Sequence, residues 1–306
     1  MRRSIMRSIM LIACYTASAS AFNVMVNGMP GPMATAAAEA CLRKNMDLCP
    51  FAMTGPDVPP QTILVTDPDT GRSASVDLIP SSSLSTLKAL LPTSPNTIAI
   101  DYTHPSSVNS NGDFYTTSGI PFVMGTTGGD RSLLLSTVTS PPHYCVIAPN
   151  MGKQIVAMQY ALETLESKFP GAFKGYNLKV TESHQKKKAD TSGTAKAVVG
   201  NINGMIGSSS FDVENDVVLL RDDVSSTNFG VPEEYLDAGH AFHTYTLTSG
   251  DGSVEFELKH NVCGRRVYAE GTADAVKFLG KVMKEKGEEG ARVYSMIDVL
   301  EEGALE

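Results

Sequence analysis

The chain has 306 residues, 42% of them hydrophobic, and a formal net charge of −8 at pH 7. A sizeable core can therefore form, and the acidic balance argues against nucleic acid as the main partner, because DNA-binding proteins usually carry a basic excess. The 5 cysteines are dispersed without a CxxC pair, which is typical of free thiols in a reducing compartment and not of a disulfide framework or a metal site.

Residues 1–21 have the layout of a targeting signal. Three arginines precede a short apolar stretch, and small residues then lead to an Ala-Ser-Ala-Phe junction that resembles a plastid-import junction. The apolar stretch is too short to span a bilayer, so we expect no stable membrane insertion. We therefore predict a plastid protein that loses residues 1–21, with a disordered tail on a cytoplasmic protein as the alternative.

A strand, a glycine turn and a helix follow one another from residue 22. The apolar run 22–26 predicts a buried strand, Gly28 and Gly31 follow it, and an alanine-rich helix then begins. In this setting the glycines let the backbone approach a pyrophosphate, and the helix start supplies N–H groups. An ordinary structural turn explains the motif equally well on its own. Because proline has no N–H, the donors come from the other turn residues, Met29, Gly31 and Met33.

The second strand of the predicted sheet covers about Leu48 to Met53. In NAD-specific folds an acidic residue commonly ends this strand and holds the ribose 2′-OH. Here the strand is followed by Thr54-Gly55-Pro56, with neither an acid for the hydroxyl nor an arginine for a 2′-phosphate. The sequence therefore leaves the choice between NADH and NADPH open.

Three further apolar runs end in residues typical of ligand-binding loops. The segments 98–105, 120–130 and 143–152 end in Tyr-Thr-His-Pro, Gly-Thr-Thr-Gly-Gly and Ala-Pro-Asn-Met. Their continuous apolar character fits a parallel sheet covered on both faces, and ligands bind beyond the carboxyl ends of such strands. Turn chemistry explains each ending alone. Together with the glycine turn, the endings predict a Rossmann-type, parallel-sheet dinucleotide-binding domain over residues 22–150.

The patterning changes after Met151, where we place the crossover to a second domain. A helical run ends at Pro170-Gly171, and later apolar segments alternate with polar residues as in half-buried strands. Two such runs around Gly-Asp-Gly at 250–252 predict a hairpin. We therefore predict a smaller α+β domain over residues 151–270, with a mixed or antiparallel sheet and a helix from Thr194 to Met205. A helix over 273–287 and the tail, about 271–306, complete the first domain.

The stretch ESHQKKKADTSGTAKA at 182–197 concentrates charge in front of a helix start. His184 and Lys188 bring an acid/base group and a cation, and Ser192-Gly193-Thr194 opens the helix. Gly193 lets a ligand approach the backbone, and the free N–H groups of a first turn favour a carboxylate or phosphate. The alternative is a solvated charge run with an ordinary serine N-cap. Beside a nucleotide-binding domain, the stretch is a candidate site for reducing a carboxylate-bearing substrate.

A series of segments in chain order carries a family resemblance: VNGMPGPM, DYTHP, PFVMGTTGGDR, ESHQKKKADTSGTAKAV, GVPEEYL, GHAFHTY and HNVCGR. With these segments the chain resembles the dihydrodipicolinate reductases, and their plant-type branch most closely, over nearly all of residues 22–306. The resemblance implies NADPH- or NADH-dependent reduction of 4-hydroxy-tetrahydrodipicolinate, a cyclic dicarboxylate, to tetrahydrodipicolinate in the diaminopimelate route to lysine. It also implies a homo-oligomer, dimer or tetramer, formed through the sheet of the second domain.

The resemblance further implies roles for individual residues. His184 corresponds to an acid/base and Lys188 to the proton donor, while Gln185 stands where many bacterial members have a second histidine. Ser192-Gly193-Thr194 corresponds to the segment that holds a substrate carboxylate. The cofactor contacts correspond to the glycine turn and three strand ends: Gly28, Met29, Pro30, Gly31, Pro32, Met33, Tyr102, Thr103, Gly125, Thr126, Thr127, Ala148, Pro149, Asn150 and Met151.

Two other classes of function stay open on the residues alone. Another two-domain nicotinamide dehydrogenase, acting on an amino acid, would share this architecture. A non-enzymatic nucleotide-sensing module would keep the glycine turn. We predict no metal site, because the spacing of His240, His243 and His260 suits core or sheet-surface positions better than ligation.

Overall fold

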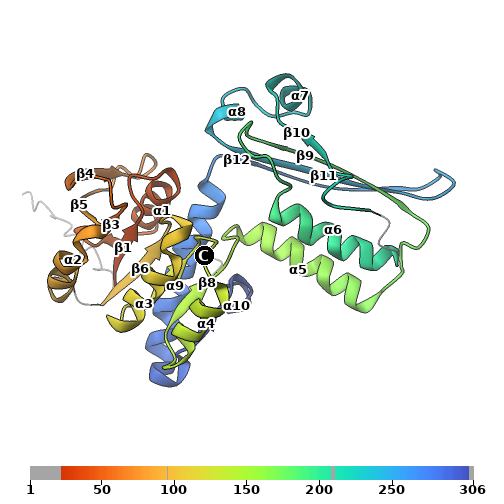
Figure 1. Cartoon of the computed structure of the whole chain (residues 1–306). Coiled ribbons are helices and arrows are strands. Elements are labelled where there is room, and N and C mark those ends of the chain that lie inside the picture. Colours follow the sequence, from red (N-terminus) through yellow and green to blue (C-terminus); the bar gives the residue numbers. More distant parts are fainter. Residues whose placement is uncertain (1–21, 95, 208–210, 303–306) are drawn as a thin grey trace, which may run out of the picture.

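The computed structural model describes residues 22–94, 96–207 and 211–302, so the predicted targeting segment 1–21 lies outside the described residues. Figure 1 shows two layered parts side by side, one built on a parallel sheet and the other on a long-stranded sheet above two helices. Within the described part of the chain, no helix combines the length and the apolar character needed to cross a bilayer.

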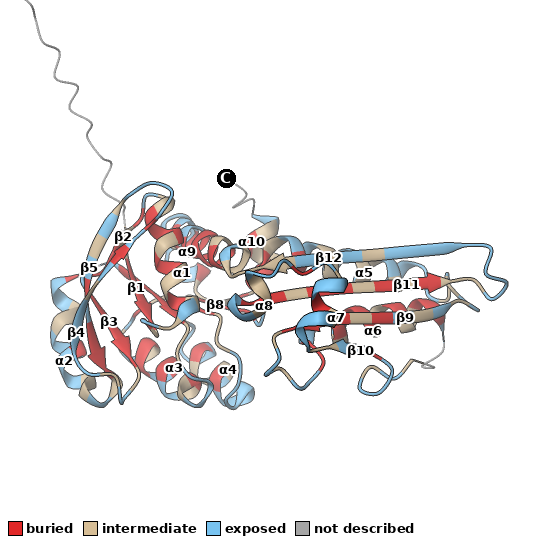
Figure 2. Cartoon of the chain, turned by 90° about the horizontal axis from the view of Figure 1, so that it is seen from above, coloured by how far each residue is buried: buried red, intermediate tan, exposed pale blue. Residues whose placement is uncertain are grey.

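A six-stranded sheet in the order β13-β8-β7-β6-β1-β2 forms the first part, and all its pairs are parallel. Helices α1 and α9 pack together over one face of this sheet, and α3 and α4 lie on the other (Figure 2). The sheet is the predicted Rossmann type. Its elements are β1 (Asn23–Asn27), α1 (Pro32–Arg43), β2 (Asp47–Leu48), β6 (Thr97–Asp101), a 3-10 turn (Pro105–Ser107), α3 (Val108–Thr117), β7 (Phe122–Met124), α4 (Arg131–Thr139), β8 (Cys145–Ile147), α9 (Arg266–Lys286) and β13 (Val293–Tyr294).

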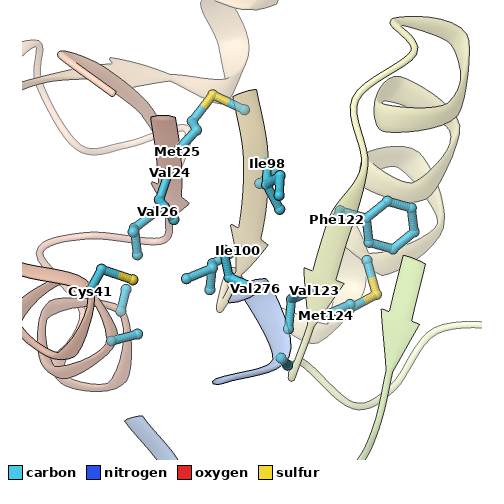
Figure 3. Close-up of a cluster of buried hydrophobic side chains, with 14 of the residues drawn as sticks. Val24, Met25, Val26, Cys41, Ile98, Ile100, Phe122, Val123, Met124 and Val276 are labelled. Atoms are coloured by element: carbon cyan, nitrogen blue, oxygen red, sulfur yellow. The ribbon is translucent and has the colours of Figure 1, made fainter. Parts of the chain in front are cut away.

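The central strands are buried on both faces, which explains their continuous apolar sequences. Every residue of β6 and β7 is buried. The side chains of Val26, Ile100 and Val123 lie in register on neighbouring strands and converge with Cys41 of α1 and Val276 of α9 (Figure 3). Each fully buried aliphatic side chain stabilises the fold by about 1.5–3 kcal/mol. This core fixes the strand ends that carry the predicted ligand loops.

The single strand predicted at 48–53 is wrong in its extent, because it is two strands. β2 pairs with β1, whereas β3 (Phe51–Thr54) belongs to a separate sheet in the order β3-β5-β4. Pro50 lies between them and cannot donate a ladder hydrogen bond, so the chain changes sheets there. The other two strands of this small sheet and the helical segments that follow them were not predicted: β4 (Gln61–Thr66), β5 (Ser73–Pro80), α2 (Leu84–Leu90) and the 3-10 turns Ser81–Ser83 and Leu91–Thr93.

The second part carries the mixed sheet that the alternating segments predict. Strand β9 pairs antiparallel with β11 and parallel with β10, and β11 forms the predicted hairpin with β12. Helices α5 and α6 pack on each other and on one face of the sheet, where Val180, Val198 and Tyr245 are buried. The elements are α5 (Lys153–Lys168), β9 (Asn177–His184), α6 (Gly193–Ile206), β10 (Val218–Leu220), α7 (Asp223–Asn228), α8 (Tyr235–Ala238), β11 (His240–Thr248) and β12 (Glu255–Cys263).

Helix α9 returns the chain from the second sheet to the first. It begins at Arg266, whereas the sequence predicted a start at residue 273. The prediction missed the first turns because Gly271 and Thr272 lower the local helix propensity. A Cβ on Gly271 would lie 1.8 Å from the carbonyl oxygen of Met151, so glycine lets α9 cross close to the start of α5. Beyond it lie a 3-10 turn (Gly287–Gly290), β13 beside β8, and α10 (Met296–Glu301). The return of the chain to the first sheet through α9 supports the predicted domain limits, which we retain as a proposal.

Candidate active site

The glycine turn after β1 has no room for side chains at its two glycines. Gly28 has a φ of 103°, and a Cβ there would lie 2.3 Å from the carbonyl oxygen of Tyr102. A Cβ on Gly31 would lie 2.7 Å from the carbonyl oxygen of Gly28. Gly31 is the N-cap of α1, and no side chain caps this helix start. The start of α1 therefore offers backbone N–H groups and a positive dipole end to an anion.

Buried Asp101, at the end of β6, organises the neighbouring loops. Its carboxylate accepts hydrogen bonds from the Thr103 N–H (3.0 Å), Asn111 Nδ2 (2.9 Å) and the Tyr115 hydroxyl (2.7 Å). Thr126 Oγ1 lies 3.1 Å from both the carbonyl oxygen and Oδ1 of Asp101. Burial, with the nearby Asp101, holds the pKa of Tyr115 well above its usual value, so this hydroxyl remains a donor. The prediction missed this role, although an acid that ends a fully apolar strand signals it.

Tyr102 joins the end of β6 to α9. Its hydroxyl lies 2.5 Å from Thr272 Oγ1, and burial raises its pKa to about 12. A Cβ on Gly125 would lie 2.4 Å from the Tyr102 ring, so the loop after β7 needs glycine at this position. The predicted cofactor residues Tyr102, Thr103, Gly125 and Thr126 thus form one packed edge of the sheet.

The helix start at 192–194 has the predicted form. Ser192 is the N-cap of α6, and its Oγ accepts a hydrogen bond from the Ala195 N–H at 3.0 Å. The Ser192 N–H donates to Glu182 Oε2 at 3.1 Å. A Cβ on Gly193 would meet nothing within 4 Å, so the space in front of the first turn is open. The N–H groups of this turn can donate hydrogen bonds to a carboxylate.

Two cavities bring the predicted cofactor and substrate residues together. One of 690 Å³ is lined by Thr127, Pro149 and Asn150 from the first sheet and by Gly193 and Thr194 from α6. Asn150 Nδ2 lies 3.4 Å from Thr194 Oγ1 across it. The other, of 320 Å³, is lined by residues that include Met33, His184, Gln185, Arg265 and Tyr268. Both cavities therefore have walls from both parts of the chain, as a site for two ligands requires. Arg265 was not predicted.

The lysines of the charged loop make only exposed or partly exposed ion pairs. Lys188 Nζ lies 2.9 Å from Asp190 Oδ1, and Lys186 Nζ lies 2.6 Å from Asp223 Oδ2. Lys186 and Lys188 line a third cavity of 620 Å³, together with Gln185, Lys187 and Asp237. Exposed pairs of this kind contribute little to stability, so a bound dianion can draw Lys188 away from Asp190.

A buried polar cluster lies beneath the charged loop. Glu182 hydrogen-bonds Arg221, and its Oε2 lies 3.4 Å from His243 Nε2, which is 3.3 Å from His184 Nε2. Burial would raise the pKa of Glu182, but hydrogen bonds from His243, Arg221 and the Ser192 N–H lower it to about 2. Burial and then His243 lower the pKa of His184 to about 3. The site therefore holds an ionised carboxylate beside a neutral imidazole.

His243 shows the limit of the prediction for the three histidines. It is buried, as a core position implies, yet it also reaches Ser192 and His184 in the candidate site. His260 stacks on it with ring centroids 4.5 Å apart. His240 is satisfied by Ser183 Oγ at 2.8 Å and the Tyr235 carbonyl at 3.0 Å.

Glu182, His184 and His243 are the residues whose spacing could accommodate a metal ion. Their donor atoms lie within 4.8 Å of one another, and all three residues are buried. The Arg221 guanidinium and the Ser192 N–H already occupy the carboxylate oxygens of Glu182, however. A cation bound here would also face the positive charge of Arg221. We therefore assign hydrogen bonding to this cluster rather than metal binding.

Comparison with known proteins places the whole chain in one family. Residues 22–151 match the model described as dihydrodipicolinate reductase, N-terminus, and residues 155–300 match the C-terminus model. A probable 4-hydroxy-tetrahydrodipicolinate reductase 2, chloroplastic, of Oryza sativa subsp. japonica is 44% identical over 93% of this chain and 84% of its own length. The chloroplastic reductase 2 of Arabidopsis thaliana is 44% identical over 94% of this chain and 80% of its own.

A solved structure shares the fold. The dipicolinate-bound dihydrodipicolinate reductase from Paenisporosarcina sp. TG-14 superposes with a TM-score of 0.60 at 18% identity, covering 89% of this chain and 97% of that one. At this identity the likeness shows the two-part α/β architecture alone.

Proposed function

The chain belongs to the dihydrodipicolinate reductase family, and we propose that it reduces 4-hydroxy-tetrahydrodipicolinate to tetrahydrodipicolinate. The reaction consumes NADPH or NADH and a proton, and it releases the oxidised nicotinamide and water. One observation carries the proposal: Thr127 and Asn150, at the ends of the nucleotide-binding strands, share a cavity with Gly193 and Thr194 at the α6 helix start. A hydride carrier and a carboxylate-bearing ring can therefore meet there.

The residues present fit a reduced nicotinamide nucleotide. The tight glycine turn, which has no room for a Cβ at Gly28 or Gly31, and the α1 start without a side-chain cap suit a pyrophosphate. Thr126 and Thr127 lie at the adjoining strand end and can hold the carboxamide, with Tyr102 packed beneath Gly125. The bound cofactor supplies the hydride. The protein's contribution is to fix the orientation of both ligands and to exclude water.

The substrate is a dianion, and the second domain offers two places for its carboxylates. The N–H groups of Gly193 and Thr194 at the start of α6 would receive one carboxylate. The other would face Gln185 and Arg265, which line the neighbouring cavity. Arg265 donates from Nη1 to the Ala238 carbonyl at 3.0 Å, which orients its guanidinium.

We assign the proton donation to Lys188 rather than to His184. Among the residues that the structure describes, exposed Asp190 alone pairs with the Lys188 ammonium, so a substrate carboxylate can take it over. His184 is neutral in the free site, since burial and His243 lower its pKa to about 3. A neutral imidazole supplies a hydrogen bond more readily than a proton. The distribution of roles is hydride from the cofactor, proton from Lys188, and orientation from His184 and the α6 helix start.

The relatives support a compartment, and the second sheet supports a proposal for the assembly. The plant relatives are named as chloroplastic, which supports plastid localisation with residues 1–21 as the targeting segment. We propose a homo-oligomer, because α5 and α6 cover one face of the second sheet, while Thr244, Thr246 and Thr248, which alternate with the helix-facing residues of β11, are only partly buried. Light scattering on the purified protein tests the assembly.

The function is tested by initial rates with enzymatically generated 4-hydroxy-tetrahydrodipicolinate and each reduced nicotinamide in turn. The proposal predicts substrate-dependent oxidation of at least one of them, inhibited by pyridine-2,6-dicarboxylate. Oxidation of an amino acid that ignores this inhibitor would favour another nicotinamide dehydrogenase. Cofactor binding without any turnover would favour a nucleotide-sensing module.

A further inference from the structure

We propose that His243 is a positioning residue, which orients Ser192 and holds His184 in the tautomer that presents its Nδ1–H to the substrate. The inference rests on the proposed function, because it assigns a role within that site. His243 lies in the middle of β11, paired with Glu182 of β9 on one side and with His260 of β12 on the other. Only 1% of it is exposed, so it cannot touch the ligand freely and acts through its neighbours.

One nitrogen of His243 touches three groups of the site. Its Nε2 lies 2.9 Å from Ser192 Oγ, 3.3 Å from His184 Nε2 and 3.4 Å from Glu182 Oε2. The ionised carboxylate of Glu182 can only accept hydrogen bonds, so it favours a hydrogen on this nitrogen. The other ring nitrogen, Nδ1, is buried and has no hydrogen-bond partner among the described residues. The hydrogen of a neutral His243 therefore sits on Nε2.

This assignment fixes the tautomer of His184. Two N–H groups pointing at each other across 3.3 Å would repel, so His184 Nε2 must face His243 with its lone pair. The single hydrogen of neutral His184 then lies on Nδ1. His184 lines the 320 Å³ cavity together with Gln185 and Arg265. A donor is thus available where a substrate carboxylate is proposed to lie.

The same contacts connect His243 to the helix start. Ser192 Oγ accepts the Ala195 N–H at 3.0 Å, and the Ser192 backbone N–H is held by Glu182. His243 and Glu182 together therefore hold the serine at both its side chain and its backbone. The first turn of α6 is aimed at the cavity by residues that are themselves buried in the sheet.

The charged and titratable groups around His243 come from every neighbouring element. Glu182 and His184 face it from β9, His260 stacks on it from β12, and the Tyr245 ring lies 6.3 Å away on β11. Arg221 balances the charge of Glu182. The charge of His243, when protonated, would oppose protonation of His184, whose pKa burial and His243 lower to about 3. Removing the imidazole should therefore raise the pKa of His184.

The test compares His243→Leu with His243→Gln, whose amide N–H can reach the place of Nε2. His243→Leu should lower kcat/KM about 10- to 100-fold, because it removes one hydrogen bond to a charged or polar group. Each tenfold loss corresponds to about 1.36 kcal/mol. His243→Gln should restore most of this loss. His260→Gln alters the stacked neighbour outside the site and should stay within about twofold of the wild type.

Nitrogen-15 NMR of His184 gives a readout that a merely structural role would not move. The wild type and His243→Gln should show the Nδ1–H tautomer, and His243→Leu should show a mixture with a raised pKa. The proposal is overturned by an Nε2–H tautomer in the wild type, or by His243→Leu with wild-type kcat/KM. If His243→Leu does not fold, the tautomer in the wild type and in His243→Gln decides. Absence of reductase activity in the wild type would refute the proposed function, while the tautomer would still test this inference.

Discussion

Replacing Glu182 with glutamine removes the negative charge around which the buried part of the site is built. Glu182 is fully buried, and its carboxylate binds the Arg221 guanidinium, the Ser192 N–H and, more loosely, His243 Nε2. A glutamine keeps the shape and one acceptor oxygen, but it turns an N–H group toward Arg221 or toward Ser192. Either orientation places two donors face to face.

The size of the stability loss depends on the hydrogen bonds that Arg221 keeps in the variant. Breaking a buried ion pair by removing one partner costs about 3–5 kcal/mol. Arg221 keeps four backbone acceptors, the carbonyl oxygens of Lys188 at 2.6 Å, Leu220 at 3.1 Å, and residue 182 and Asp190, both at 3.3 Å. We therefore expect Glu182→Gln to lower the free energy of unfolding by about 2–3 kcal/mol.

Urea unfolding of the full chain, followed by circular dichroism, measures this loss. Lys186→Met is the matched control, because it breaks the exposed Lys186–Asp223 pair on the same loop and should leave the unfolding midpoint nearly unchanged. A Glu182→Gln variant as stable as the wild type would refute the reasoning that a buried charge, and not packing alone, holds the loop and helix start together.

Three further predictions follow. Lys188→Met should reduce kcat by about 10²–10⁴ with unchanged circular dichroism, and Lys186→Met should not; equal rates would remove Lys188 from proton donation. Gly28→Ala should weaken cofactor affinity at least about tenfold in a fluorescence titration, because a Cβ there would lie 2.3 Å from the Tyr102 carbonyl oxygen. Stability should fall as pH is lowered from 7 to 5, because His184 takes up a proton near pH 6.5 in the unfolded chain, while its pKa in the folded protein is about 3. The free energy of unfolding should fall by up to about 2 kcal/mol through this group. In urea titrations, His184→Gln should abolish this part of the pH dependence.

Local patterns predicted the elements whose formation depends on nearby residues. The alternation around Gly-Asp-Gly fixed the β11–β12 hairpin, and Ser192 before Gly193 fixed the start of α6. The continuous apolar strands identified the parallel sheet because helices cover both its faces. The small β3-β5-β4 sheet was missed, although the turn at 67–71 between two β-branched segments is an available hairpin signal.

The buried part of the site depends on pairings that no local pattern contains. His243 meets Glu182 because β11 pairs with β9 across some sixty residues of sequence, and Arg221 joins them from the end of β10. The early start of α9 was hidden for a similar reason, since Gly271 serves a close approach to Met151 rather than the helix itself. The sequence could thus nominate candidate ligand contacts, whereas the residues that hold those candidates in place required the register of the sheet.

The most direct test of the account is a crystal structure of the protein with NADPH and pyridine-2,6-dicarboxylate bound together. One carboxylate should lie within hydrogen-bonding distance of the Gly193 and Thr194 N–H groups, the ring between Lys188 and the nicotinamide, and the nicotinamide beside Thr126 and Thr127. Density for the dicarboxylate away from the start of α6, with the cofactor in place, would contradict it.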